Sequence, residues 1–503
     1  MEHVSLQCRT DHDSLSSGTG ASPAISFSAL ISALSFAIDL TEGAVPGHAL
    51  RTCVLGMRIA NAIELPLDQA TALHRALMLK DVVYNSSGPR SLPSNSADEW
   101  GGRKSAKFVD WSKPQRPVFG GVNFSWLDIL PQSSKIQQLA RLGRMAFQQR
   151  HDSSERSLLR SERGAGIVEK LGLSKDTVRA ISALDEHWDG SGYPERLKGP
   201  EIPLLGRILG VAEHLDVFAS ERDRETAIRD LHERSNRWFD PSLVRVVDVL
   251  ENRNGLWQQC LATDGTDMAR RVALDMEPGQ QHFSNETDVD RICEAFADVV
   301  DAKSPFTYRH SVGVADVATS MATVLQLAPD RVQLVRRAAL LHDLGKLAIP
   351  NSILDKPGNL TSEEWDLVVQ HPRLTREILN RIDSFAELAE IAGAHHEKLD
   401  GSGYPDGLTA SQLSLEARIV AAADVYQALI EHRPYRAGLS HSEAMKVLHR
   451  LAGIKLDAHC VAAIAVARDP WTVWTPTTQV DAAGPRRRPE LSLHAVEETV
   501  LSA

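Results

Sequence analysis

Apolar residues recur every three or four positions along most of this 503-residue chain, and alternating runs of β-branched residues are almost absent. A period near 3.6 residues is typical of amphipathic helices, whereas strands alternate at every second residue. The pattern therefore predicts an all-α fold. Because the chain is too long for one ordinary hydrophobic core, we expect two domains with tails.

Three predicted helices carry a polar residue on an otherwise apolar face. Their face positions are Val332, Val335, Ala339 and His342; Phe385, Leu388, Ile391, Ala392 and His395; and Ala417, Val420, Ala421, Asp424 and Ala428. Gly345 is expected to end the first of these helices. A buried polar group is costly unless it is coordinated or hydrogen-bonded. These helices are therefore expected to deliver two histidines and an aspartate to one site.

The chain contains an internal repeat. His48 precedes Lys80-Asp81 by 32 residues, and His310 precedes His342-Asp343 by the same interval. The sequence Asp-Gly-Ser-Gly-Tyr-Pro occurs at 189–194 and again at 400–405. The first pair of matches has an offset of 262 residues and the second an offset of 211, so the first copy carries 51 extra residues. We interpret the chain as a tandem duplication.

Composition suggests where the two copies begin and end. The Gly-, Pro- and Ser-rich stretch at about 85–125 is the expected insertion in a first domain of residues 25–255. Helix-breaking residues predict a linker at 256–284 before a second domain at 285–469. Residues 1–24 and 470–503 are expected to be mobile tails.

Charge and cysteine usage limit the classes of function. The chain has 55 Lys and Arg against 66 Asp and Glu, a net charge of −11, which disfavours binding to nucleic-acid polymers or anionic membranes. Its five cysteines are scattered and form no CxxC pair. No apolar run reaches the roughly 18 residues of a membrane helix, and no signal-peptide pattern is seen at the start. We expect a soluble cytoplasmic protein.

The residues around His342-Asp343 are typical of a metal site. Imidazole and carboxylate ligands together suit Fe, Mn or Zn, and the carboxylate of a His-Asp pair can bridge two ions. The pair is followed by Lys346, His371, His395-His396 and Asp424. One such pair means little, but this many ligand-type residues indicate a metal-dependent phosphohydrolase.

Residues 285–460 resemble an HD-GYP domain, the branch of the HD phosphohydrolase superfamily that hydrolyses cyclic di-GMP. The resemblance assigns the metal-ligand positions to His310, His342, Asp343, His371, His395, His396 and Asp424. Gly403-Tyr404-Pro405 is the loop that names the family. Lys346 is the cation beside the metals, and Arg433 and Arg436 match positions that contact phosphate.

The resemblance implies an all-helical domain with two divalent ions, Fe or Mn, bridged by Asp343. A hydroxide on the two metals would attack phosphorus while Lys346 stabilises the developing charge. The expected activity is a cyclic di-GMP phosphodiesterase. From the residues alone, Tyr404 fits a packing role as well as substrate contact, and Arg433 and Arg436 fit a solvated surface pair as an alternative.

Two positions depart from the family pattern. Phe306 stands four residues before His310, where some members carry a glutamate ligand for a third metal, so two metals are expected. Gln427 stands where aspartate is common after Asp424, which alters a hydrogen bond behind the ligands.

The first copy has lost most of the ligands. Lys80, Arg160, Leu184-Asp185 and Glu213 stand at the places of His342, His371, His395-His396 and Asp424. Basic residues there would repel metal, so we expect a metal-free half that serves as an input, dimerisation or substrate-sensing module. Its retained loop at 189–194 fits either a turn requirement or a nucleotide-binding or pairing surface.

Alternative functions stay open at the level of sequence. The metal centre predicts the reaction type better than the base, so another nucleotide or phosphoester is the first alternative. A catalytically silent nucleotide-sensing protein is the second. A homodimer and pairing of the two halves within one chain are both expected arrangements.

Overall fold

The computed structural model describes residues 25–42, 47–85, 170–253, 255–257, 265–279, 283–303, 309–356, 358–432 and 437–467. Both predicted tails, all but the first residue of the predicted insertion, and the residues Arg160, Phe306, Arg433 and Arg436 lie outside these ranges.

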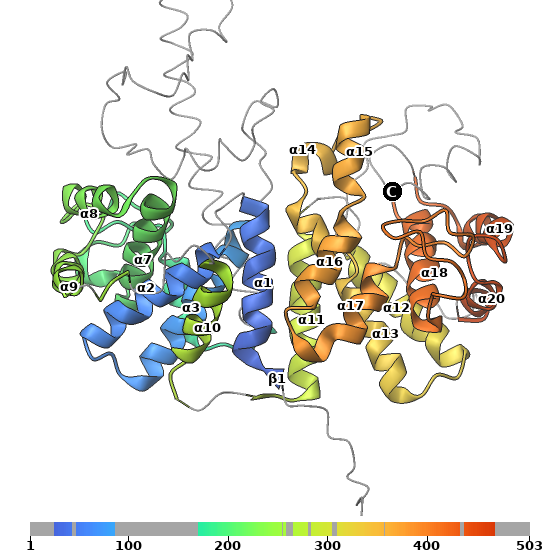
Figure 1. Ribbon diagram of the computed structural model, residues 1–503, viewed down its shortest axis with the longest axis horizontal. Helices are drawn as coiled ribbons and strands as arrows, with labels where there is room; N and C mark the ends of the chain where they lie inside the picture. The colour runs from blue at the N-terminus through green and yellow to red at the C-terminus, as the bar shows by residue number, and fades with distance from the viewer. Residues whose placement is uncertain are drawn as a thin grey trace, which may run out of the picture.

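The first group of helices comes from the N-terminal half of the chain (Figure 1). It comprises α1 (Phe27–Glu42), α2 (His48–Ala62), α3 (Leu67–Asn85), α6 (Lys175–Ser182), the 3-10 turn η1 (Gly199–Glu201), α7 (Leu204–Glu221), α8 (Arg224–Glu233), α9 (Pro241–Asn252) and α10 (Gly265–Asp275). Within it, α2 packs against both α3 and α7. The segment expected as a linker contains α10, which also packs against α2.

The second group comes from the C-terminal half. It comprises α11 (Glu286–Asp301), α12 (His310–Val324), α13 (Pro329–Leu341), η2 (Leu344–Ala348), α14 (Asn351–Leu354), α15 (Ser362–Val368), α16 (His371–Leu379), η3 (Asp383–Phe385), α17 (Ala386–Gly393), α18 (Leu415–Ile430), α19 (His441–Leu451) and α20 (Ala458–Ala467). Here α12 packs against α13 and α18, as α2 does against α3 and α7.

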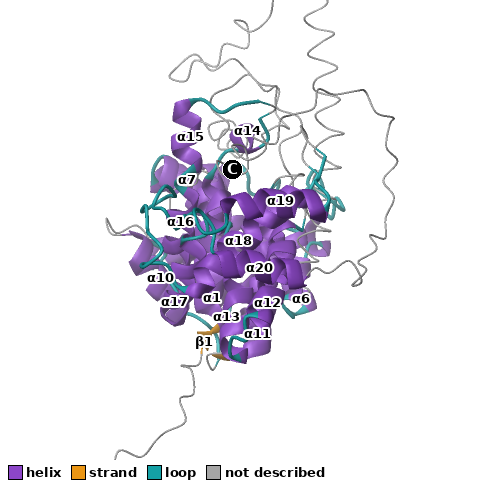
Figure 2. Ribbon diagram, turned by 90° about the vertical axis from the view of Figure 1, so that its right-hand side faces the viewer, coloured by secondary structure: helices purple, strands orange, loops and turns teal. Residues whose placement is uncertain are grey.

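The prediction of an all-α fold is confirmed. In the described ranges the named strands are β1 (Ile25–Ser26) and β2 (Phe283–Ser284), which pair antiparallel at one end of the helical body (Figures 1 and 2). None of the helices described is long and apolar enough to cross a membrane.

The two groups touch through α1. This helix packs against α3 of its own group and against η2 and α16 of the other. Arg270 on α10 donates a hydrogen bond to the backbone oxygen of Arg381 at 2.8 Å, and the Arg381 guanidinium lies 3.5 Å from the ring centroid of Phe36. The first half of the chain therefore supports the element that follows Asp343.

Candidate metal centre

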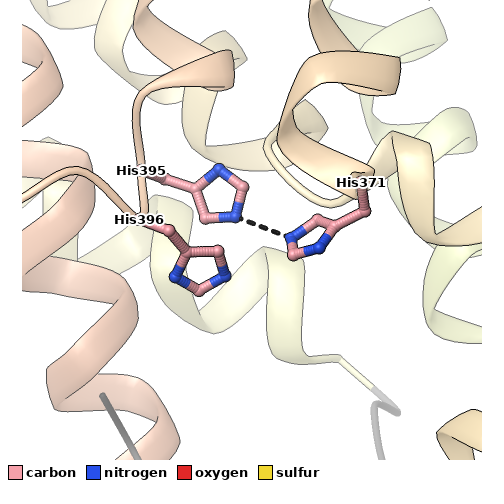
Figure 3. Close-up of side chains that lie close together, drawn as sticks. All are labelled: His371, His395 and His396. Carbon is pink, nitrogen blue, oxygen red and sulfur yellow. Dashed lines mark hydrogen bonds between the residues drawn. The ribbon is translucent and has the colours of Figure 1, made fainter. Parts of the chain in front are cut away.

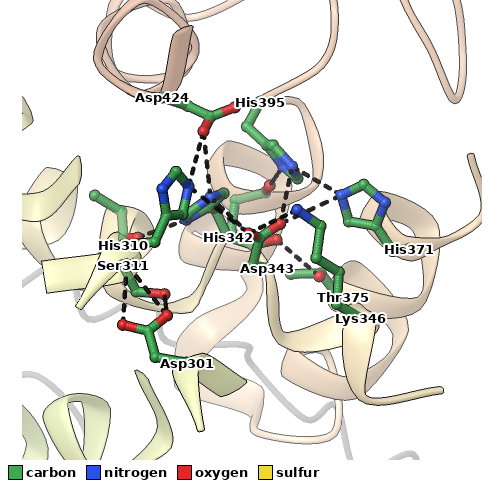
Figure 4. A network of polar contacts seen from close by, with 12 residues as sticks. Asp301, His310, Ser311, His342, Asp343, Lys346, His371, Thr375, His395 and Asp424 are labelled. Atoms are coloured by element: carbon green, nitrogen blue, oxygen red, sulfur yellow. Dashed lines mark hydrogen bonds and ion pairs between the residues drawn. The ribbon is translucent and has the colours of Figure 1, made fainter. Parts of the chain in front are cut away.

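Helix ends place the predicted ligands. His310 is the first residue of α12, and its N-cap Arg309 adopts a left-handed conformation (φ 64°), which is uncommon for a residue other than glycine. His342 caps the C-terminus of α13, and His371 begins α16. His395 follows the end of α17, and Asp424 lies within α18. Because these ends meet, side chains more than 100 residues apart in sequence face one another (Figure 4).

Three of the histidines have the same tautomer fixed by the backbone. Their Nδ1 atoms lie 2.7 Å from the carbonyl oxygen three residues earlier, in His342, His371 and His395. A carbonyl can only accept a hydrogen bond, so each Nδ1 carries the proton and each Nε2 presents a lone pair. This is the tautomer that binds a metal through Nε2.

Asp343 lies between two sets of candidate ligands. Its Oδ1 is 3.4 Å from His371 Nε2 and 3.7 Å from His395 Nε2. Its Oδ2 is 3.3 Å from His342 Nε2 and 3.9 Å from His310 Nε2. One carboxylate therefore offers one oxygen to each set.

Asp424 and His396 complete the two sets of candidate ligands. Asp424 Oδ1 lies 3.1 Å from His310 Nε2 and 3.7 Å from His342 Nε2. His396 joins His371 and His395, and donor atoms of these three lie within 4.8 Å of one another (Figure 3). The site thus has a set with His310, His342 and Asp424 and a set with His371, His395 and His396, and Asp343 is shared.

These donors fit divalent cations. His371 Nε2 and His395 Nε2 are 3.1 Å apart although both Nδ1 atoms are already protonated, so two lone pairs face each other. Within the described residues, His342 Nε2, Asp343 Oδ1 and His396 Nε2 are buried without a hydrogen-bond partner. Unpaired buried acceptors are costly, and bound cations would remove that cost.

The pKa shifts favour the forms that bind metal at most positions. Burial and the neighbouring histidines hold the pKa of His395 and of His396 well below the usual value, so both are neutral. Burial alone would raise the pKa of Asp343, but His342 and Lys346 hold it well below its usual range. His310 and His342 are the exceptions. Burial lowers both pKa values, but Glu431 and Asp424 raise the pKa of His310 to about 10, and Asp343 raises the pKa of His342 above its usual value.

Lys346 is the cation nearest to the shared carboxylate. It lies in η2, and its Nζ is 2.9 Å from Asp343 Oδ2. Its side chain is 17% exposed, so the ammonium is accessible at the edge of the site.

The Gly-Tyr-Pro loop forms one wall of the site. The Tyr404 ring lies 4.8 Å from the His396 ring, and its hydroxyl is buried with no hydrogen-bond partner among the described residues. A Cβ at Gly403 would lie 2.5 Å from the backbone of Glu397, so the loop needs glycine there. The Tyr404–Pro405 peptide bond is cis.

The sequence pattern of the HD domain family matches residues 146–243 and 294–460, together more than half of the chain. The chain belongs to the HD domain family.

The chain is similar to several known phosphodiesterases, with different identities and over different lengths. It is 37% identical to "3'3'-cGAMP-specific phosphodiesterase 3" of Vibrio cholerae over 88% of this chain and 94% of that protein. It is 44% identical to "Cyclic di-GMP phosphodiesterase response regulator RpfG" of Xanthomonas campestris over 30% of this chain and 41% of that protein. The crystal structure of a cyclic GMP-AMP specific phosphodiesterase of V. cholerae superposes with a TM-score of 0.60 at 32% identity, over 88% of this chain and 98% of that one.

Several supporting residues of the HD-domain site were missed by sequence analysis. Thr375 Oγ1 donates to the His342 oxygen at 2.9 Å and accepts from the Gly345 N–H at 2.8 Å. Glu397 accepts backbone N–H groups of Asp406 and Leu408, which anchors the Gly-Tyr-Pro loop. Only Glu397 gave a signal, because it directly follows His395-His396.

The expected role of Gly345 is corrected by the structure. Helix α13 ends at Leu341, four residues earlier, and Gly345 lies inside η2. A Cβ there would lie 2.0 Å from the His371 oxygen. The glycine is needed because the turn passes directly over the start of α16.

The corresponding place in the first half holds an internal cation. Lys80 is fully buried, and its Nζ lies 2.8 Å from His48 Nε2 and 2.5 Å from Asp81 Oδ2. Donor atoms of His48, Asp81 and Glu213 lie within 4.8 Å of one another, so three of the predicted positions come together in the first half.

Proposed function

We propose that the second half of this HD-domain protein is a two-metal phosphodiesterase that hydrolyses a cyclic dinucleotide. The observation that carries the proposal is the position of Asp343, whose Oδ2 faces His310 and His342 while its Oδ1 faces His371 and His395. A single structural ion would need only one set.

The proposed ligands of one ion are His310, His342, Asp424 and Asp343 Oδ2. Those of the other are His371, His395, His396 and Asp343 Oδ1. Mixed imidazole and carboxylate ligands suit Fe or Mn. When bound, two such ions lower the pKa of water and polarise phosphoryl oxygens, the chemistry that hydrolysis of a phosphodiester requires.

The protein's own residues would position the substrate. Lys346 is placed to stabilise negative charge on the phosphoryl oxygens, because it is a donor at the edge of the cluster. The Tyr404 hydroxyl can donate to a substrate oxygen, since it has no partner within the described part of the site. Arg433 and Arg436 stay predicted phosphate contacts.

Two cyclic dinucleotides are candidate substrates. Cyclic di-GMP was expected from the resemblance, and the similarity to RpfG supports it. The similarity to the V. cholerae enzyme named for 3′3′-cGAMP extends over 88% of the chain and so includes most of the first half. We propose 3′3′-cGAMP as the preferred substrate and cyclic di-GMP as the second candidate. Both would be met in the cytoplasm, the location expected from sequence.

We propose that the first half is a metal-free copy of the second. Asp39 and Asp301, at the 262-residue offset, both accept backbone N–H groups at the start of the following helix. Glu186 and Glu397, at the 211-residue offset, both accept N–H groups of the loop after Tyr-Pro. These matched contacts support a division into domains at 25–255 and 285–469.

A substrate panel tests the proposed function. The full chain, reconstituted anaerobically with Mn²⁺ or Fe²⁺, should hydrolyse 3′3′-cGAMP faster than cyclic di-GMP, and linear or mononucleotide products can be separated by chromatography. Simple phosphomonoesters serve as the control. Hydrolysis of those alone would reject the cyclic dinucleotide.

A further inference from the structure

The first half contains a complete arrangement for orienting a histidine. His48 Nε2 accepts from the Lys80 ammonium at 2.8 Å, because an ammonium can only donate. The proton of His48 is therefore on Nδ1, which lies 2.6 Å from Asp216 Oδ2. Asp216 thus fixes both the tautomer and the orientation of the ring.

The second half lacks a carboxylate at the matching position. His310 corresponds to His48 at the 262-residue offset, and Gln427 corresponds to Asp216 at the 211-residue offset. An amide in place of the carboxylate provides a weaker hydrogen-bond acceptor and no charge.

A different carboxylate takes over the contact. Glu431 Oε2 lies 2.9 Å from His310 Nδ1, while His310 Nε2 faces Asp424 Oδ1 at 3.1 Å. Gln427 Nε2 donates to Glu431 Oε1 at 2.7 Å. Glu431 directly follows the last residue of α18 and is four residues after Gln427. Residues four apart lie on one face of a helix, so Gln427 can hold Glu431 in place.

A further exchange makes room for this arrangement. A Cβ at Gly313 would lie 2.3 Å from Gln427 Nε2, so glycine leaves space for the longer amide. The matching residue in the first half is Arg51, whose Nε donates to Asp216 Oδ1 at 2.7 Å. An arginine–aspartate pair in one half thus corresponds to a glycine–glutamine pair in the other.

We propose that Glu431 is the positioning residue for His310, and that Gln427 holds Glu431 in place. The carboxylate that orients this histidine lies one helical turn later than its counterpart in the first half. The inference rests on the proposed function, because it assigns His310 Nε2 to a metal ion. A hydrogen bond from Nδ1 to a carboxylate is the usual way in which a metal-binding histidine is oriented.

The test measures metal binding by the full chain rather than activity. Metal-free protein is titrated anaerobically with Mn²⁺, and the two dissociation constants are compared among variants. Glu431→Ala should weaken the binding of one of the two ions by about 10- to 100-fold and leave the binding of the other unchanged. Glu416→Ala is the control, since that α18 carboxylate binds Arg331 and no histidine.

A rescue variant separates positioning from general damage. The double variant Gln427→Asp with Glu431→Ala should recover the lost affinity, because it restores the carboxylate position found in the first half. Glu431→Gln keeps the size of the side chain but removes its charge, and it should weaken the binding of the same ion.

Two results would overturn the inference: Glu431→Ala and Glu431→Gln binding both ions as tightly as the wild type, or a folded double variant that binds no better than Glu431→Ala. If the wild type itself binds no Mn²⁺ or Fe²⁺, the proposed function fails instead.

Discussion

At the scale of single residues, a buried cation distinguishes the cluster of the first half from that of the second. In the second half two carboxylates face five histidines, and several buried acceptors have no donor in the described part of the site. In the first half the ammonium of Lys80 already contacts His48 Nε2 and Asp81 Oδ2. In our proposal, this single basic side chain takes the place of a metal ion in the first half.

Replacing Lys80 by alanine should destabilise the first half. The change leaves His48, Asp81 and Glu213 close together without the buried cation, which should cost about 3–5 kcal/mol in the free energy of unfolding. Added Mn²⁺ should recover part of this loss in the variant. Urea unfolding with and without metal measures both effects, and the exposed Lys175→Ala is the control. A Lys80→Ala protein as stable as the wild type without metal would disprove the role of Lys80.

Lys346→Ala should lower turnover with little change in metal content. Its ammonium is not a ligand but is placed to contact phosphoryl oxygens, so the expected cost is roughly 2–4 kcal/mol in the transition state, or about 30- to 900-fold in rate. Steady-state kinetics combined with metal analysis checks this. If the variant instead loses its metals, Lys346 supports Asp343 rather than the substrate.

At the scale of elements, the helix ends that carry the candidate ligands were predictable, because histidine and aspartate on apolar faces are distinctive. The apolar faces ending at His342 and His395 matched α13 and α17. The contacts behind the ligands were not predictable. Glu431 meets His310 across 121 residues of sequence, and only packing of α18 on α12 brings them together.

Gly345→Ala should damage the site without changing any ligand. The added Cβ overlaps the His371 oxygen, so η2 must move away from α16, and overpacking of this kind costs about 1–3 kcal/mol. The temperature of thermal unfolding and the affinity for Mn²⁺ should both fall. Gly358→Ala is a matched control, because nothing described lies within 4 Å of a Cβ there. Equal behaviour of the two variants would contradict the proposed close contact.

At the scale of the whole molecule, the first half supports the second. Helix α1 packs against η2 and α16, and β1 pairs with β2. Pairing of the two halves was one of two arrangements expected from the sequence, but the paired surfaces could not be identified, because apolar faces do not reveal their partners.

Fragments of residues 25–279 and 280–467, when coexpressed, should therefore copurify. The second fragment alone should unfold at a lower temperature, since η2 and α16 lose the cover of α1. The first fragment alone should bind no Mn²⁺. Pull-down and calorimetry test these expectations. Fragments that stay separate, with a second fragment as stable and active as the full chain, would show that the halves are independent.

The metal content of the anaerobically purified full chain, measured beside hydrolysis of 3′3′-cGAMP and cyclic di-GMP, tests the central claim most directly. The wild type should carry two Fe or Mn ions per chain and release product. Asp343→Ala should remain folded but lose both the ions and all turnover, because the shared carboxylate is absent. Wild-type protein without metal, or an Asp343→Ala protein with unchanged metal and turnover, would contradict the two-metal centre.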